Sequence, residues 1–350
     1  TSSEKRFFKK FVARNFTEGT SNYVKLFDAV NAQKEYDEQK ILTGEKYIGQ
    51  LPKLKNYLYD LILKSLESYH YSMDKDSELK STLHRVKILF EKGLYGKCRE
   101  ILSKAKKIAY QYDKYSHIIE IIKWNIKIAG ENVEDCNSLN QLFVERQQII
   151  ECIKRIDEYA VLFFRMRTLY LKKGVDLRAE GLSEQYEEIM RHPLLADEKQ
   201  PCTYEEKLHY LKTHIHFCSI TRNMRHSYLY SQKLVELIAS QPNRIYEERA
   251  DYVTSLNNLV LAASSIMKPD KTQEVFDKLQ KAVIRFPSER HRIILGYNAM
   301  LNMYMKKGLF SEGRLYALEA EELLREYEEK IPAPVKIVLL YNLTRIYFIT

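Results

Sequence analysis

The sequence predicts an all-α protein, and three observations support this prediction. Only 8 of the 350 residues are Pro and 11 are Gly, so long segments lack the residues that interrupt helices. Alternating β-branched patterns, which indicate strands, are scarce, whereas apolar residues recur every three or four positions along most of the chain. With 45% hydrophobic and 29% charged residues, the composition is typical of a folded globular protein and not of a disordered one.

Residues 1–76 are predicted to form a small basic helical domain with its own core. Ser2 or Ser3 can cap a first helix, whose apolar stripe includes Phe8 and Val12. A second helix begins near Tyr23, and a strongly periodic helix follows over Lys53–His70. The basic side of the first helix could contact nucleic acid or anionic lipid, although an aromatic stripe of this kind is more often part of a core.

The segment Leu83–Tyr112 predicts an antiparallel helical hairpin. A first apolar stripe ends at Gly93, the residue type best suited to the positive φ of a helix C-terminus. A second stripe begins at Cys98 and continues through Ala105. The two helices are therefore joined by a very short loop.

This hairpin resembles the tetratricopeptide (TPR) repeat. In that family a Gly turns the chain, an aromatic residue such as Tyr95 fills the junction, and small residues allow close helix packing. The signature LFEKGLYGKC recurs as YMKKGLFSEG at Tyr304–Gly313. Gly308, Phe310, Gly313 and Ala320 then correspond to Gly93, Tyr95, Cys98 and Ala105. The resemblance extends over residues 77–350 and implies a right-handed α-α superhelix with a concave surface.

The central part of the chain contains the longest periodic pattern. After a helix that ends near Gly130, a capping box at Ser138 begins a pattern that continues to Gly174. This pattern allows one long helix or two shorter ones. Because Gly174 fits the end of a TPR first helix, we expect a tight break around residues 155–157.

Regular hairpins are predicted after a weakly patterned segment at residues 175–203. The paired helices are Tyr204–Thr221 with Arg225–Ser240, Tyr246–Met267 with Lys271–Arg285, and His291–Lys307 with Ser311–Lys330. A last helix, Val335–Ile349, is apolar on more than one side. A terminal solenoid helix needs a polar outer face. We therefore expect the natural chain to continue past Thr350, and this helix to self-associate when it is left uncovered.

The net charge of +9 is concentrated in one stretch. Residues 81–127 contain eleven basic and four acidic side chains. A basic patch that could attract phosphates or an acidic partner comprises Lys97, Arg99, Lys104, Lys106 and Lys107. The simpler interpretation is the solvated side of two helices.

The sequence contains no motif that supports an enzyme, a metal site or a cofactor. The group most similar to a metal site consists of scattered residues and includes no HExxH or CxxC element: His209, His214, His216, Cys218 and His226. His209 and His216 are expected to share one helix face. The five cysteines have no paired spacing, which favours a reducing cytoplasm, and no apolar run approaches the length of a membrane span.

Asparagines on the first helices of the hairpins are the best candidates for a binding site. They are Asn257 or Asn258, Asn298, Asn302 and Asn342. In proteins of the family that this chain resembles, such groove amides bind the backbone of an extended peptide; equally, they could bond neighbouring helices. The leading hypothesis is a cytoplasmic scaffold that binds a peptide or protein segment. The alternative is a ligand-sensing regulator whose basic N-terminal domain contacts nucleic acid.

Overall fold

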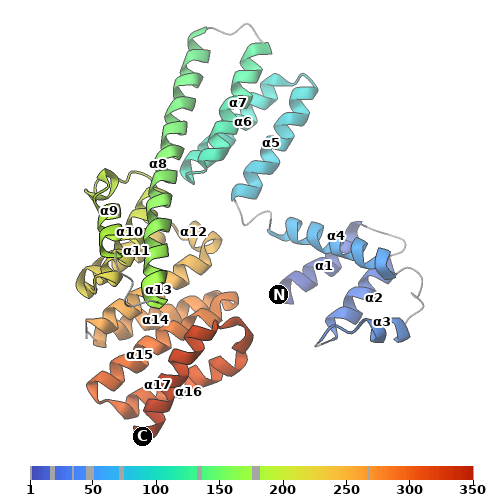
Figure 1. Cartoon of the computed structure of the whole chain (residues 1–350). Coiled ribbons are helices and arrows are strands. Elements are labelled where there is room, and N and C mark those ends of the chain that lie inside the picture. The colour runs from blue at the N-terminus through green and yellow to red at the C-terminus, as the bar shows by residue number, and fades with distance from the viewer. Residues whose placement is uncertain are drawn as a thin grey trace. The chain divides into compact units, whose positions relative to one another are not determined.

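The computed structural model describes residues 2–15, 20–33, 35–44, 51–70, 75–131, 136–175, 182–266 and 269–349. Within these ranges the chain forms seventeen α-helices and three short 3-10 helices, with no strand. The predicted all-α class is therefore confirmed. The chain divides into two compact units, Thr1–Gln147 and Gln148–Thr350, which Figure 1 colours from blue to green and from green to red.

The first unit begins with four helices that share a core. They are α1 (Ser2–Asn15), α2 (Thr20–Asn31), α3 (Glu38–Gly44) and α4 (Leu51–His70). Each contributes to one buried cluster of seven residues: Phe8, Val12, Leu26, Ile41, Leu51, Leu58 and Leu61. The apolar stripe of α1 is thus part of a core. The domain boundary that we predicted after residue 76 lies inside this unit, in the first turn of the next helix.

Three further helices follow in the first unit, which ends at Gln147 within the helix after them: α5 (Lys75–Glu91), α6 (Tyr95–Gln111) and α7 (Tyr115–Glu131). The predicted hairpin is confirmed, because α5 and α6 pack together around a turn in which Gly93 has a φ of 70°. The ring of Tyr95 contacts that of Phe90, which also contacts Trp124 of α7. The aromatic residue after the turn therefore fills the junction between helices.

Helix α8 (Cys136–Val175) is one uninterrupted helix of 40 residues, so the break that we predicted at residues 155–157 is wrong. Continuous packing explains the difference. Ile156 and Tyr159 are buried, the Tyr159 hydroxyl donates to the Leu194 carbonyl, and the Arg155 Nε lies 3.2 Å from a carboxylate oxygen of Glu206. Tertiary contacts thus hold the segment helical where repeat phasing suggested a turn.

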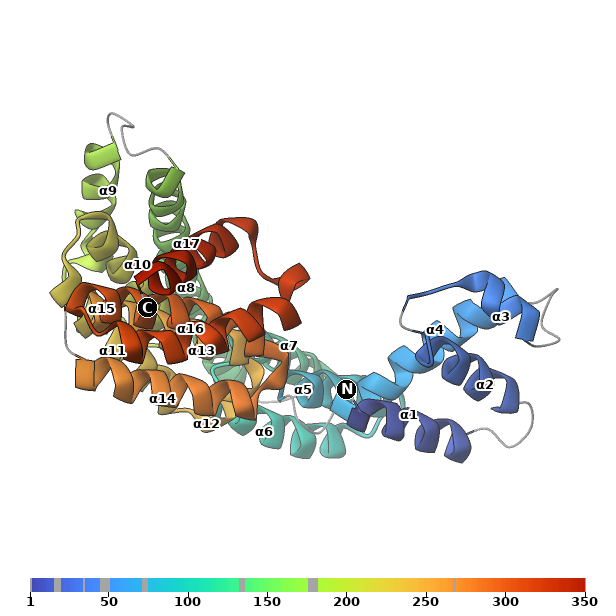
Figure 2. The ribbon, with the colours of Figure 1, turned by 90° about the horizontal axis from the view of Figure 1, so that it is seen from below.

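The second unit continues with helices that pack in sequential pairs (Figures 1 and 2). Its α-helices are α9 (Leu182–Met190), α10 (Tyr204–Ile220), α11 (Met224–Ala239), α12 (Pro242–Glu247), α13 (Arg249–Ser265), α14 (Pro269–Arg285), α15 (Ile294–Lys307), α16 (Phe310–Glu326) and α17 (Ala333–Ile349). The 3-10 helices are η1 (Pro193–Leu195), η2 (Pro287–Ile293) and η3 (Glu328–Lys330). The three predicted hairpins correspond to α10–α11, α13–α14 and α15–α16. Pro242 and Pro287 begin short helices, a position that favours Pro because its missing N–H needs no partner there.

The first helices of successive pairs also pack on one another. Helix α13 contacts α15, and α15 contacts α17. One large core cluster extends over α13–α17, and a second joins α8 and α9 to α10–α12. This stacking gives the unit one layer of first helices, on which the candidate site is built.

Candidate functional site

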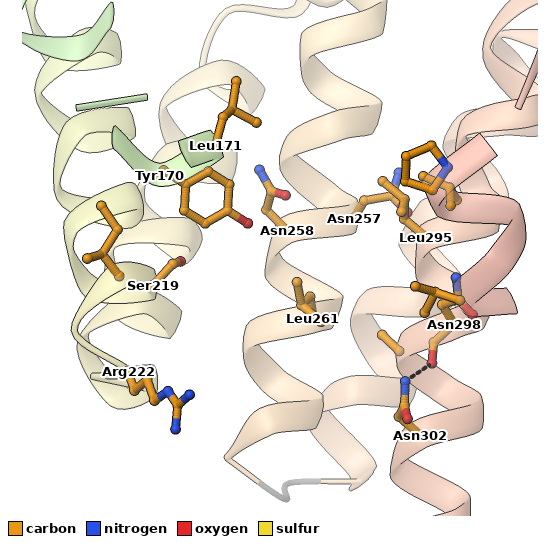
Figure 3. A pocket seen from close by; sticks show the side chains of 15 residues that line it. Tyr170, Leu171, Ser219, Arg222, Asn257, Asn258, Leu261, Leu295, Asn298 and Asn302 are labelled. Atoms are coloured by element: carbon orange, nitrogen blue, oxygen red, sulfur yellow. Dashed lines mark hydrogen bonds between the residues drawn. The ribbon is translucent and has the colours of Figure 1, made fainter. Parts of the chain in front are cut away.

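A cavity of about 820 Å³ lies on the layer of first helices in the second unit. Five helices line it: α8, α10, α13, α15 and α17. In Figure 3, Asn258 and Leu261 project from α13 between the α10 side and the α15 side. The lining residues are Tyr170, Leu171, Ser219, Ile220, Arg222, Asn257, Asn258, Leu261, Leu295, Asn298, Ala299, Asn302, Pro334, Val335 and Val338.

Three of the four predicted groove asparagines, Asn258, Asn298 and Asn302, line this cavity together with Asn257. Asn342 does not line it. It is 2% exposed, and its Nδ2 donates to Asn298 Oδ1 at 3.1 Å. The amide of Asn342 therefore holds the side chain of Asn298, which lines the groove, and this hydrogen bond joins α15 to α17.

The groove amides differ in how many of their hydrogen-bonding groups already have a partner within the protein. Asn257 Nδ2 donates to the carbonyls of Val253 and Arg292, so it joins α13 to η2. Asn302 Nδ2 donates to the Asn298 carbonyl at 3.0 Å, the dashed line of Figure 3. Asn258 is half-buried and has no hydrogen-bond partner within the described ranges. Asn258 and the Oδ1 of Asn302 are thus the amide groups best placed to bind a ligand backbone.

Exposed apolar side chains make up much of the remaining wall. Tyr170, Leu171, Leu261, Leu295 and Val338 all line the cavity although each is more than a third exposed. Large exposed apolar surface in a concave site is typical of a binding groove. The two α8 residues, Tyr170 and Leu171, were not predicted to line a site. Repeat phasing places them in a short helix, and the pattern within one helix does not show which of its faces the later helices leave uncovered.

Arg222 is the one charged side chain among the lining residues that the structure describes. It lies in the turn between α10 and α11 with a φ of 58°, and the Asn223 N–H donates to the Cys218 carbonyl at 2.8 Å. The turn therefore resembles the Gly93 turn, but with Arg in the left-handed position. A side chain normally disfavours this conformation, so no local pattern indicated it.

The predicted basic patch is partly neutralised by acidic neighbours. Lys97 and Lys104 each lie 3.0 Å from Glu100, and this pairing lowers the pKa of the Glu100 carboxyl. Lys106 lies 2.7 Å from Glu145. The other two members, Arg99 and Lys107, are exposed on the same helix.

Nucleic-acid contact by the N-terminal helices stays a prediction. Lys9 of α1 pairs with Asp28 of α2 at 2.7 Å, so one of its basic side chains is engaged in packing. Retention of random duplex DNA on a filter at low salt tests the prediction, because phosphate contacts weaken steeply as salt increases.

The histidines of α10 are embedded among aromatic rings. His209 and His216 both contact the Phe163 ring, which confirms that they share one face. Burial, with the nearby Lys212 cation, lowers the pKa of His209 to about 4. Burial, with Arg167 and Lys212, likewise lowers the pKa of His216 to about 4. No group of three or more potential metal ligands occurs in the described part of the chain.

Among the described residues, the helices include none with the length and hydrophobicity of a membrane span. No protein-family model matches this chain, and no curated protein matches it. The resemblance to TPR repeats therefore rests on the residues of the hairpins themselves.

Proposed function

We propose that the second unit is a TPR-like binding scaffold and not an enzyme, and that its cavity accepts an extended segment of a partner protein. The observation that carries this proposal is the composition of the lining, in which exposed apolar side chains lie beside amides on neighbouring helices. Amides provide a donor and an acceptor for each peptide unit of a bound backbone, and apolar walls provide most of the binding free energy.

The lining also supports a proposal for the chemistry of the bound segment. Apolar side chains of the segment would pack on Leu261, Leu295 and Val338. An acidic group would lie near Arg222, since that guanidinium is the charged group of the described lining. The expected ligand is therefore an extended, largely apolar peptide with a carboxylate at one end of its contact region.

Selection from a random peptide library on the full chain tests the proposal. Enriched peptides should be apolar with an acidic residue, and Arg222→Ala should remove the preference for the acid. Asn258→Ala and Asn302→Ala should each weaken binding by about 1 kcal/mol, with thermal stability unchanged. Asn298→Ala differs, because it leaves buried Asn342 without its acceptor and should cost stability as well.

A matched pair of apolar substitutions provides the control. Leu261→Asp places a charge in the cavity and should abolish peptide binding, whereas Leu315→Asp changes a comparably exposed leucine of α16 that does not line the cavity. If both variants bind the selected peptides as the wild type does, the cavity is not the binding site. Loss of stability in both Asn258→Ala and Asn302→Ala would show that those amides are structural.

A further inference from the structure

Helix α8 has a second apolar face, separate from the groove. Its inner face is buried against the rest of the second unit at Ile156 and Tyr159. On the outer face Val161 is 57% exposed and Phe164 is 55% exposed, and Ile150 is also exposed. A shallow cavity of about 500 Å³ lies along this face, between α8 and His192.

The exposed positions follow a heptad pattern. Ile150, Lys154, Asp157, Val161 and Phe164 are separated alternately by four and three residues, the spacing of the contact positions in a helix pair. The two central positions are an exposed cation and an exposed anion. Neither Lys154 nor Asp157 forms an ion pair with another residue in the described part of the chain.

These charges favour one arrangement of two such helices. In a parallel pair Lys154 would face Lys154 and Asp157 would face Asp157, which is repulsive. In an antiparallel pair with its two-fold axis between residues 155 and 156, each Lys154 faces Asp157 and each Ile150 faces Val161. A shift by one heptad either way would place the charges against uncharged positions. Polar pairs at such central positions set register and orientation.

We propose that the outer face of α8 is a self-complementary surface that binds a second copy of this chain through an antiparallel α8–α8 contact. Residues 150–164 extend over about 21 Å of helix. One face of so short a helix buries less than the roughly 800 Å² per partner of a standard interface. The dimer is therefore expected to be weak and to dissociate on dilution. The central ion pairs determine the register, while the flanking apolar pairs provide the attraction.

Charge reversal provides a specific test by sedimentation velocity on the full chain. Lys154→Asp and Asp157→Lys each place like charges across the two-fold axis, and each should raise the dissociation constant about tenfold or more. An equimolar mixture of the two variants should restore association, because every position 154 then faces an opposite charge at position 157. The double variant Lys154→Asp/Asp157→Lys should also associate as the wild type does.

Two controls separate this surface from others. Lys281→Asp reverses an exposed charge on α14 and should leave association unchanged. Ile337→Glu changes the exposed face of α17, where 68% of Ile337 is accessible and where the sequence predicts a separate self-association, and it should leave the α8 contact intact. The proposal is overturned if the wild type is monomeric, if the single reversals associate as the wild type does, or if their mixture fails to associate. It is also overturned if Ile337→Glu alone loses association.

Discussion

The hairpins α5–α6 and α15–α16 have the same turn in different surroundings. In each, a Gly follows the first helix with positive φ, 70° at Gly93 and 72° at Gly308. The Gly93 N–H donates to the Phe90 carbonyl and the next N–H to that of Leu89, and the Gly308 turn repeats both bonds with Met305 and Tyr304. These are the two bonds of a Schellman motif. The turn is therefore local and does not depend on what packs around it.

The two hairpins differ at the small residue on the second helix. In α6 this position is Cys98, fully buried, with its Sγ 3.6 Å from the Val86 carbonyl. In α16 it is Gly313, where an added Cβ would lie 2.6 Å from Ile346 Cδ1 and 3.2 Å from Tyr304 Cβ. The second hairpin is covered closely by α17 at this point. A shared signature thus specifies the turn, whereas the following helix decides how small the packing residue must be.

The largest expected difference between the units is their response to acid. His209 and His216 have pKa values of about 4 in the folded second unit, below the ordinary value of about 6.5. As pH falls, these histidines are protonated in the unfolded chain before they are protonated in the folded one. The free energy of unfolding therefore decreases as pH falls from about 6.5 toward 4. The loss should be on the order of 2 kcal/mol for each histidine by pH 5.

A spectroscopic difference makes this prediction measurable. The single tryptophan, Trp124, belongs to the first unit and packs on Phe90. Acid should therefore lower helical circular dichroism before tryptophan fluorescence changes. His209→Phe/His216→Phe should shift the acid transition to lower pH, and a transition identical to that of the wild type would contradict the assignment to these two rings.

A second prediction concerns two glycines with opposite expected effects. Gly313→Val introduces a side chain against Ile346 and Tyr304 and should destabilise the protein by about 1–3 kcal/mol. Gly96 lies in α6, where an added Cβ would have no neighbour within 4 Å. Gly96→Ala should therefore stabilise the helix, by less than the roughly 1 kcal/mol of a helix interior because Gly96 lies in the first turn. Urea unfolding measures both changes, and effects of the same sign would show that the surroundings of the two hairpins are more alike than their contacts indicate.

The smallest expected difference between the hairpins concerns the turns themselves. Gly93→Ala and Gly308→Ala each force a side chain into the left-handed region, in open space at both sites. Each should cost about 1–2 kcal/mol, and the two costs should agree, since the hydrogen bonds are the same. Markedly unequal losses in urea unfolding would mean that tertiary contacts influence these turns.

The candidate groove was predictable only in part. Helical periodicity placed Asn298 and Asn302 one turn apart, and both line the cavity. Periodicity could not distinguish Asn257 from Asn258, and it could not show that Asn342 is covered while it supports Asn298. Those distinctions depend on which face of α13 and α17 meets the neighbouring helix.

The sequence by itself determined the helical class, the approximate positions of the hairpins and the glycine turns, because spacing and φ preferences act within a few residues. Tertiary structure decided the continuity of α8, which contacts with Leu194 and Glu206 hold helical through residues 155–157. The turns at Asp113 and Arg222 were also not predictable from a Gly, because other residues hold the positive φ values that Gly would adopt more readily. Packing free energy summed over whole helices exceeds the roughly 1–2 kcal/mol by which a single residue prefers another conformation, so a local pattern cannot reveal where packing prevails.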